Sequence, residues 1–439
     1  MDCCRARSTR PIMGIETTAA LPDDVLLEVL ARVADVAALF RCAAVCKLWR
    51  TLIADGSFLR RRWPDNASHR TSSVGFFTQQ RLQGKQDEDL LVGVDKVTDP
   101  DSPPVFVPVR DSALGPGRRS FLGPGAPAGL LNGATPLAAR GGLLLLRLAP
   151  HDDHHGPVEL AVCDPFSGTC DVLPPLVCEP VRFLRYAILT SQDCYLTNGQ
   201  STNGRRTAPP VTPNYSTFFR VLAMGLASDN GYLECNLHRC SSTEPSWAVS
   251  TERLGGDVHG HGVWTYGQND AAVCSGGMAH WLCDGWSAID DSSSYFTIDV
   301  RSEDGDVSLA KLSLPLPAIK PTLEHFHMAD HHGDLSLFCL HTGEEGLGLE
   351  VWTRRKGADW YLARVVELRP RIEGVTYLWH GEKSDTLFIN SDAEDMYVAY
   401  LDTGAVEKIT NEFHGLTTDD AIPMEIDWPS FLMSRLGGR

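Results

Sequence analysis

The sequence predicts an α+β multidomain chain in which a small all-α helical unit is followed by a large all-β domain. Three observations lead to this prediction. Apolar residues recur at helical spacing only near the amino terminus. From residue 72 onward, short apolar runs alternate with turns rich in Gly, Asp and Pro. The length of 439 residues exceeds the roughly 150 residues of an ordinary single domain.

Composition narrows the class of protein. Hydrophobic residues make up 43% and charged residues 22%, which is typical of a globular chain. Neither a membrane-spanning run nor the apolar core of a secretory signal is present, so we expect a cytoplasmic or nuclear protein. The 13 cysteines are odd in number and form no Cys-x-x-Cys pair, which favours reduced thiols.

Charge is divided unevenly along the chain. Residues 1–70 hold 11 Lys and Arg against 8 Asp and Glu, whereas the remaining 369 hold 28 against 48. A nucleic-acid module needs a concentrated basic face, and the large part of this chain is acidic. The sequence therefore excludes nucleic acid as the expected partner.

The helical unit is predicted as three or four short helices between residues 21 and 63. Pro22 suits a first helical position, and the two aspartates after it suit the positive end of the helix dipole. Asp35 is predicted to cap a second helix. Asp55 and Gly56 are predicted to end a third helix. The apolar stripes of the first and third helices comprise Val25, Leu26, Val29, Leu30 and Val33, and Val45, Leu48, Trp49, Leu52 and Ile53.

So small a unit cannot bury enough apolar surface by itself. Two interpretations of its stripes stay open on periodicity alone. The unit packs on the downstream domain, or it offers an apolar face to another protein.

The residue pattern of this segment resembles the F-box, the motif that docks on the SKP-type adaptor of cullin-based ubiquitin ligases. The resemblance covers residues 18–64 and departs at Val33-Ala34, where many members have Leu-Pro. It rests on Leu21-Pro22, Leu26-Leu27, Val29, Leu30, Val45-Cys46-Lys47-x-Trp49, Leu52 and the segment from Phe58 to Trp63.

The resemblance implies a role for each matching residue. It implies adaptor contact for Leu21, Pro22, Leu26, Leu27, Leu30, Val45 and Cys46. It implies packing within the F-box for Val33, Leu39, Trp49, Leu52 and Ile53. The implied partners are an SKP-type adaptor and, through it, a cullin.

The β-rich part is expected to be a β-propeller. Apolar runs begin at Ser73, Gly142, Phe218, Met278, Asp334 and Asp385, and strand–turn–strand segments begin at Val158, Ser294, Leu347 and Tyr397. The last three apolar runs start 56 and 51 residues apart, and blades of about 50 residues predict six or seven of them. A pair of β-sandwiches is the alternative. The strand–turn–strand pattern of residues 72–430 resembles the F-box-associated propeller domain of plant proteins, especially those of grasses.

Four segments are expected to lie outside regular structure. These are a disordered leader at 1–17, a mobile Pro- and Gly-rich insert at 99–136, a polar insert at 198–214 and a tail at 431–439.

Catalytic, cofactor and metal sites are not predicted. Standard hydrolase, phosphate-loop and metalloprotease motifs are missing from the sequence. Two His/Asp groups could bind zinc or manganese, but each precedes a glycine and is better interpreted as a polar hairpin turn. They are His151, Asp152, Asp153, His154 and His155, and His325, His327, Asp330, His331, His332 and Asp334. The tryptophans at 247, 264, 281, 286, 352, 360 and 379 are expected to pack within blades.

These observations predict a substrate-recognition subunit of an SCF-type ubiquitin ligase, with an unknown protein substrate held by the propeller. Two alternatives stay open. One is an F-box protein that binds the adaptor without forming a ligase. The other is a propeller hydrolase or sugar-binding protein with a helical leader.

Overall fold

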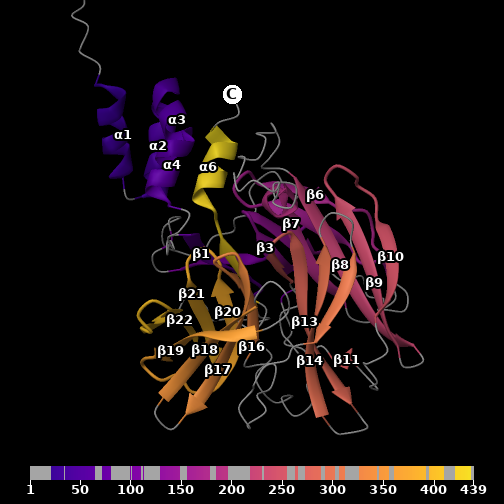
Figure 1. The fold of residues 1–439 in the computed structure, drawn as a ribbon. Coiled ribbons are helices and arrows are strands. Elements are labelled where there is room, and N and C mark those ends of the chain that lie inside the picture. Colours follow the sequence, from indigo (N-terminus) through magenta and orange to yellow (C-terminus); the bar gives the residue numbers. More distant parts are fainter. Residues whose placement is uncertain are drawn as a thin grey trace, which may run out of the picture.

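The computed structural model contains a group of short helices, a β-propeller and a carboxy-terminal helix (Figure 1). It describes residues 21–33, 35–64, 72–80, 99, 101–109, 112, 129–148, 156–177, 184–195, 218–229, 232–254, 263–264, 272–287, 292–301, 306–311, 326–343, 346–354, 360–391, 395–409 and 421–436. The predicted leader, the insert at 198–214, the group at 151–155 and His325 lie outside these residues.

The helical unit consists of α1 (Asp23–Ala31), α2 (Val36–Val45), α3 (Lys47–Ala54) and α4 (Gly56–Arg62). Asp35 caps α2 as predicted, because its carboxylate accepts a hydrogen bond from the Ala37 N–H at 2.9 Å. Asp55 ends α3 as predicted, because it follows Ala54 and its N–H donates to the Leu52 carbonyl at 3.4 Å, but its backbone is extended rather than left-handed. Its carboxylate accepts from the Ser57 N–H at 2.8 Å and so begins α4, with Gly56 inside that helix.

Six antiparallel sheets form the blades of the propeller. Blade I comprises β1 (Ser73–Thr78), β2 (Val105–Pro108) and β24 (Ile422–Glu425). Blade II comprises β3 (Thr135–Arg140), β4 (Leu143–Arg147), β5 (Leu160–Asp164) and β6 (Thr169–Val172). Blade III comprises β7 (Leu184–Thr190), β8 (Phe219–Asp229), β9 (Tyr232–Ser241) and β10 (Ala248–Leu254), with α5 (Ser191–Tyr195) after its first strand.

The other three blades follow in chain order. Blade IV comprises β11 (Val263–Trp264), β12 (Val273–Ser275), β13 (Met278–Ser287), β14 (Ser292–Arg301) and β15 (Val307–Lys311). Blade V comprises β16 (Phe326–His331), β17 (Asp334–Gly343), β18 (Gly346–Arg354) and β19 (Trp360–Leu368). Blade VI comprises β20 (Val375–Gly381), β21 (Thr386–Ser391), β22 (Met396–Tyr400) and β23 (Val406–Ile409).

The two ends of the β-domain close the ring together. The inner strands β24, β3, β7, β12, β16 and β20 are neighbours in that order, and β20 contacts β24 again. Strand β24 comes from the end of the domain and pairs antiparallel with β1 from its beginning, with Phe77 opposite Ile422. Blade I therefore joins residues more than 300 apart in the chain.

Residues 431–436 of the predicted tail belong instead to a helix, α6 (Trp428–Leu436), and residues 437–439 lie outside the described residues. Asp427 caps it by accepting from the Ser430 N–H at 3.2 Å. Trp428 and Leu432 lie four residues apart and are 2% and 0% exposed. The helix forms because this apolar face packs on α3 and α4.

The insert at 99–136 also contains more structure than expected. Strand β2 lies within it, and β3 begins within it. Phe106 and Val107 are both fully buried. This burial stabilises β2 despite the two prolines before it and Pro108 at its end.

One cysteine pair departs from the expected thiols. Cys163 and Cys170 lie directly opposite each other on β5 and β6 and form a disulfide with Cα atoms 4.1 Å apart. The hairpin brings the two residues together, which sequence spacing alone does not reveal. The other cysteines of the described residues are thiols.

Several predicted blade tryptophans are buried as expected. Trp281 and Trp352 are 1% and 7% exposed, and Trp247 and Trp379 pack against blade cores.

No helix in the described parts of the chain has the length and apolar character needed to cross a membrane.

Candidate functional site

The apolar residues of α1 are divided between two faces. Leu26 and Leu30 point into the helical unit and are 8% and 1% exposed. Val25 and Val29 are 40% and 50% exposed. Residues four apart share a helical face, so these two valines form an outward stripe. Leu21, which precedes the helix, is also exposed.

A second exposed apolar segment lies where α2 meets α3. Val45 is 66% exposed and Leu48 is 44% exposed. Between them, the Cys46 Sγ accepts a hydrogen bond from the Trp49 N–H at 3.5 Å and caps α3. This cap holds the turn in a defined shape while leaving its apolar side chains in solvent.

We call Leu21, Val25, Val29, Val45 and Leu48 the exposed apolar set. The helical unit is short, yet it carries five of the twelve large apolar side chains that are exposed among the described residues. Such a concentration of exposed apolar side chains is typical of a protein-interaction site.

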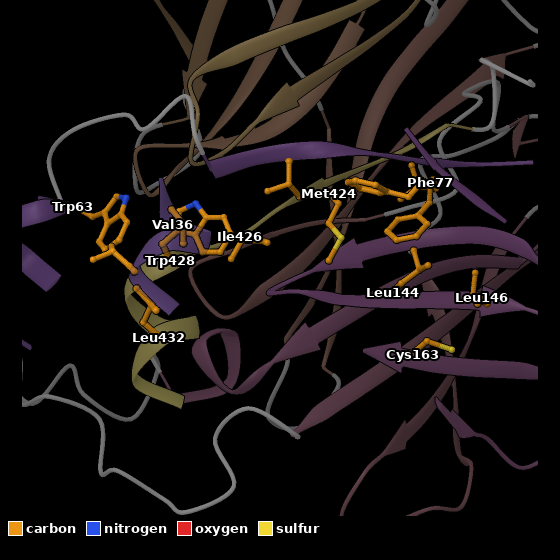
Figure 2. Packing of buried hydrophobic residues seen from close by; sticks show 14 of the residues in the cluster. Val36, Trp63, Phe77, Leu144, Leu146, Cys163, Met424, Ile426, Trp428 and Leu432 are labelled. Atoms are coloured by element: carbon orange, nitrogen blue, oxygen red, sulfur yellow. The ribbon is translucent and has the colours of Figure 1, made fainter. Parts of the chain in front are cut away.

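The other side of the helical unit is covered by the chain itself. Helices α3 and α4 contact α6, which lies between the helical unit and the blades (Figure 1). Figure 2 shows side chains of one buried cluster, in which Trp63 and Val36 lie near Trp428, and Phe77 and Leu144 lie farther into the propeller. Part of the helical stripes therefore packs on the rest of the chain, whereas the exposed apolar set lies in solvent.

The predicted adaptor-contact residues fall into two groups in this structure. Leu21, Pro22, Val45 and Cys46 are exposed, Leu27 is half-buried, and Leu26 and Leu30 are buried. Of the predicted packing residues, Leu39 and Ile53 are buried, whereas Val33, Trp49 and Leu52 are half-buried against the same cluster. The adaptor contacts themselves stay a prediction.

Three members of the exposed apolar set were not among the predicted contacts. They are Val25, Val29 and Leu48. All three belong to the helical stripes that the sequence shows, but periodicity did not indicate which half of each stripe faces outward. The packing of α1 against α3 and α4, and of α3 against α6, decides this.

A polar cluster lies among the inner strands of the propeller. Arg140, at the end of β3, donates from Nε and Nη2 to the Asp193 carboxylate at 2.7–3.0 Å. Its Nη1 donates to Glu382 at 2.9 and 3.0 Å. Burial alone would raise the pKa of the Asp193 carboxyl, but Arg140 and Thr190 outweigh it and hold that pKa below its usual range. These contacts join blades II, III and VI around one guanidinium.

The predicted His/Asp group of blade V is only partly a turn. Asp330 caps the β16–β17 turn as expected, since its carboxylate accepts from the Gly333 N–H at 2.8 Å. His331 instead faces two residues of blade VI, His380 and Asp385. Sequence reasoning missed these two partners, which lie about 50 residues downstream.

A comparison with known families identifies the helical unit. The family described as F-box-like matches residues 18–63, which include all four helices of the unit. No curated protein matches the chain. The chain therefore carries an F-box-like domain followed by a six-bladed β-propeller.

Solved propeller structures show distant likeness. The α-L-arabinofuranosidase Arb93A from Fusarium graminearum, in complex with an iminosugar inhibitor, is 10% identical over 63% of this chain and 80% of that chain, with a TM-score of 0.34. The Penicillium chrysogenum α-L-arabinanase complexed with arabinobiose is 11% identical over 64% and 82%, with a TM-score of 0.37. Likeness at this level does not extend to function.

Proposed function

We propose that this chain is the substrate-recognition subunit of an SCF-type E3 ubiquitin ligase. Its F-box-like unit binds an SKP-type adaptor, and through it a cullin, while the propeller binds the protein to be ubiquitinated. The exposed apolar set carries this proposal, because it stays uncovered on a unit whose other side packs firmly against α6. Such a complex assembles in the cytoplasm or the nucleus.

The chain contributes position rather than chemistry in this proposal. Ubiquitin transfer takes place on other subunits, so no residue of this chain acts on the bond that is formed. Holding the substrate beside the transfer enzyme replaces a bimolecular encounter with a local one. The continuous buried cluster between helical unit and propeller supports this role, since it keeps the two binding surfaces in a fixed relation.

The placement of α6 supports an inference about which end of the blades binds the substrate. Phe431 of α6 packs against Phe166 at the β5–β6 turn, and a Cβ added at Gly142 in the β3–β4 turn would lie 3.8 Å from the Phe431 ring. The helical side of the molecule thus covers this end of blade II. We infer that the substrate binds at the opposite end of the blades. The acidic balance beyond residue 70 favours a basic, lysine-rich substrate surface.

Capture of a purified SKP-type adaptor by the full-length chain tests the proposal. Val29→Asp and Val45→Asp each place a carboxylate in the expected contact. Burying an unpaired charge costs several kcal/mol, so capture should weaken by about a hundredfold or more.

Two matched variants control this experiment. Val172 and Val177 of the propeller are 52% and 69% exposed, close to the 50% and 66% of Val29 and Val45. Val172→Asp and Val177→Asp should leave capture unchanged. Adaptor binding that is equally strong in all four variants would contradict the proposed contact.

The alternatives give different results. Adaptor capture without cullin in the same complex would favour a non-ligase F-box protein. Failure of the full-length chain to capture the adaptor, together with saccharide binding by its propeller, would favour a propeller hydrolase or sugar-binding protein.

A further inference from the structure

Three potential metal ligands meet at the boundary between blades V and VI. His331 is the last residue of β16, His380 lies in β20, and Asp385 lies in the turn between β20 and β21. Strands β16 and β20 are neighbours in the inner ring, so the three side chains come from adjacent elements.

The two imidazoles converge on one carboxylate oxygen. His331 Nε2 lies 3.2 Å from Asp385 Oδ1, and His380 Nε2 lies 3.4 Å from the same atom. One potential ligand atom from each residue lies within 4.8 Å of the others. With zinc–ligand bonds of about 2.1 Å, tetrahedral coordination separates neighbouring ligand atoms by about 3.4 Å. The two histidine–aspartate separations of 3.2 and 3.4 Å match this value.

Aromatic packing fixes the orientation of both rings. Phe338 is fully buried and stacks on His380 with centroids 4.4 Å apart and planes inclined at 22°. The ring of His331 meets the same phenylalanine edge to face at 5.8 Å. The ligand atoms are thus directed toward Asp385 by residues that do not themselves bind metal, as in other metal sites.

The Asp385 side of the site is held by a tight turn. Asp385 adopts a left-handed backbone conformation, with φ of 51°, and its N–H donates to the Gly381 carbonyl at 3.0 Å. Aspartate tolerates this conformation better than most residues. The carboxylate is therefore placed by the backbone rather than by a flexible side chain alone.

We propose that His331, His380 and Asp385 form a binding site for a divalent transition-metal ion, with Zn²⁺ the ion best suited to two imidazoles and one carboxylate. The His380 side chain is fully buried, whereas His331 and Asp385 are 16% and 13% exposed, so solvent can supply a fourth ligand. The ion would tie the inner strands of blades V and VI together. The proposal is independent of the proposed ligase function.

Metal content and affinity of the full-length chain test the site. The chain is stripped with a chelator, and Zn²⁺ binding is measured by calorimetry, with Co²⁺ absorption as a spectroscopic probe of coordination. His331→Gln and Asp385→Asn should each weaken binding by about tenfold or more. Free thiols elsewhere can also bind zinc, so the difference between variant and wild type decides the result.

His341→Asn is the matched control. This histidine lies in β17 of the same blade and is exposed, but it is not one of the three converging ligands. Its replacement should leave affinity unchanged. Thermal unfolding adds a second measurement, since Zn²⁺ should raise the melting temperature of the wild type but not that of His331→Gln. A wild type without this zinc response, or equal zinc affinity in all variants, would show that the three residues form only a hydrogen-bonded cluster.

Discussion

The ring of Phe431 packs edge to face against the ring of Phe40, with centroids 5.8 Å apart and planes inclined at 75°. Phe40 belongs to α2 of the F-box-like unit, and Phe431 belongs to α6. The Phe431 ring also lies 4.9 Å from that of Phe166 in blade II. One side chain therefore connects the helical unit with the propeller, and we expect the two parts to unfold together.

Leu432→Ala should weaken this connection. Leu432 is fully buried in the cluster shared by helical unit and propeller, so removing its side chain should cost about 2–5 kcal/mol. Calorimetry should show the helical unit unfolding before the propeller in this variant. Met433, the next residue, is 44% exposed, and Met433→Ala should leave a single transition. Identical unfolding of the two variants would contradict a coupling role for α6.

The double variant Leu26→Asp with Leu27→Asp should also lose adaptor capture, but by a different route from Val29→Asp. Leu26 is only 8% exposed, so a carboxylate there must unfold α1 or be buried unpaired. Hydrogen exchange should show loss of protection across α1 in the double variant and retained protection in Val29→Asp. Full protection of α1 in both would indicate that Leu26 is accessible to the adaptor directly.

The sequence predicted the second, third and fourth strands of the blades better than the first. The six apolar runs correspond to β1, β4, β8, β13, β17 and β21, which all occupy the second position from the ring centre. The strand–turn–strand segments correspond to the two outer strands of blades II, IV, V and VI. Second strands are covered on both faces, and such strands are continuous in apolar residues.

The inner strands escaped prediction because many of their residues are polar. Strand β3 ends in Arg140, and β16 contains two histidines and an aspartate. These side chains are stabilised by partners on neighbouring blades, such as Asp193 for Arg140. Those partners lie far away in sequence, so no local pattern reveals them. The closure of blade I by β24 and the pairing of His331 with His380 were missed for the same reason.

Acid should remove the stabilising contribution that Asp193 makes to the cluster around Arg140. The pKa of Asp193 is lower in the folded chain than in the unfolded chain, so its ionised form stabilises the fold above the unfolded pKa of about 3.9. This contribution is lost as the pH falls through the lowered folded pKa. Asp193→Asn should therefore destabilise the chain by about 3 kcal/mol at neutral pH and by progressively less below about pH 4.

Urea unfolding of wild type and Asp193→Asn over a pH series measures this difference. Asp306→Asn is the control, since the Asp306 side chain is 64% exposed and its carboxylate lies as far as 3.6 Å from the Arg301 guanidinium. That substitution should change stability little at any pH. A constant gap between wild type and Asp193→Asn down to acid would show that the Asp193 charge does not stabilise the fold.

Gly75→Ala should disrupt the blade that closes the ring. A Cβ at this position would lie 2.3 Å from the Val107 carbonyl oxygen and 2.5 Å from the Phe106 ring. Both neighbours are buried and belong to β2, which pairs with β1 at this register, so neither can move away freely. The expected loss in the free energy of unfolding is about 1–3 kcal/mol, measured by urea unfolding.

Gly56→Ala is the control, because it makes the same change in the first turn of α4, where the nearest atom is 3.5 Å away on a flexible arginine. Because alanine favours a helix over glycine, Gly56→Ala should leave stability unchanged or slightly raised. Equal effects of the two substitutions would mean that the close packing of β1 on β2 does not limit the closure of blade I.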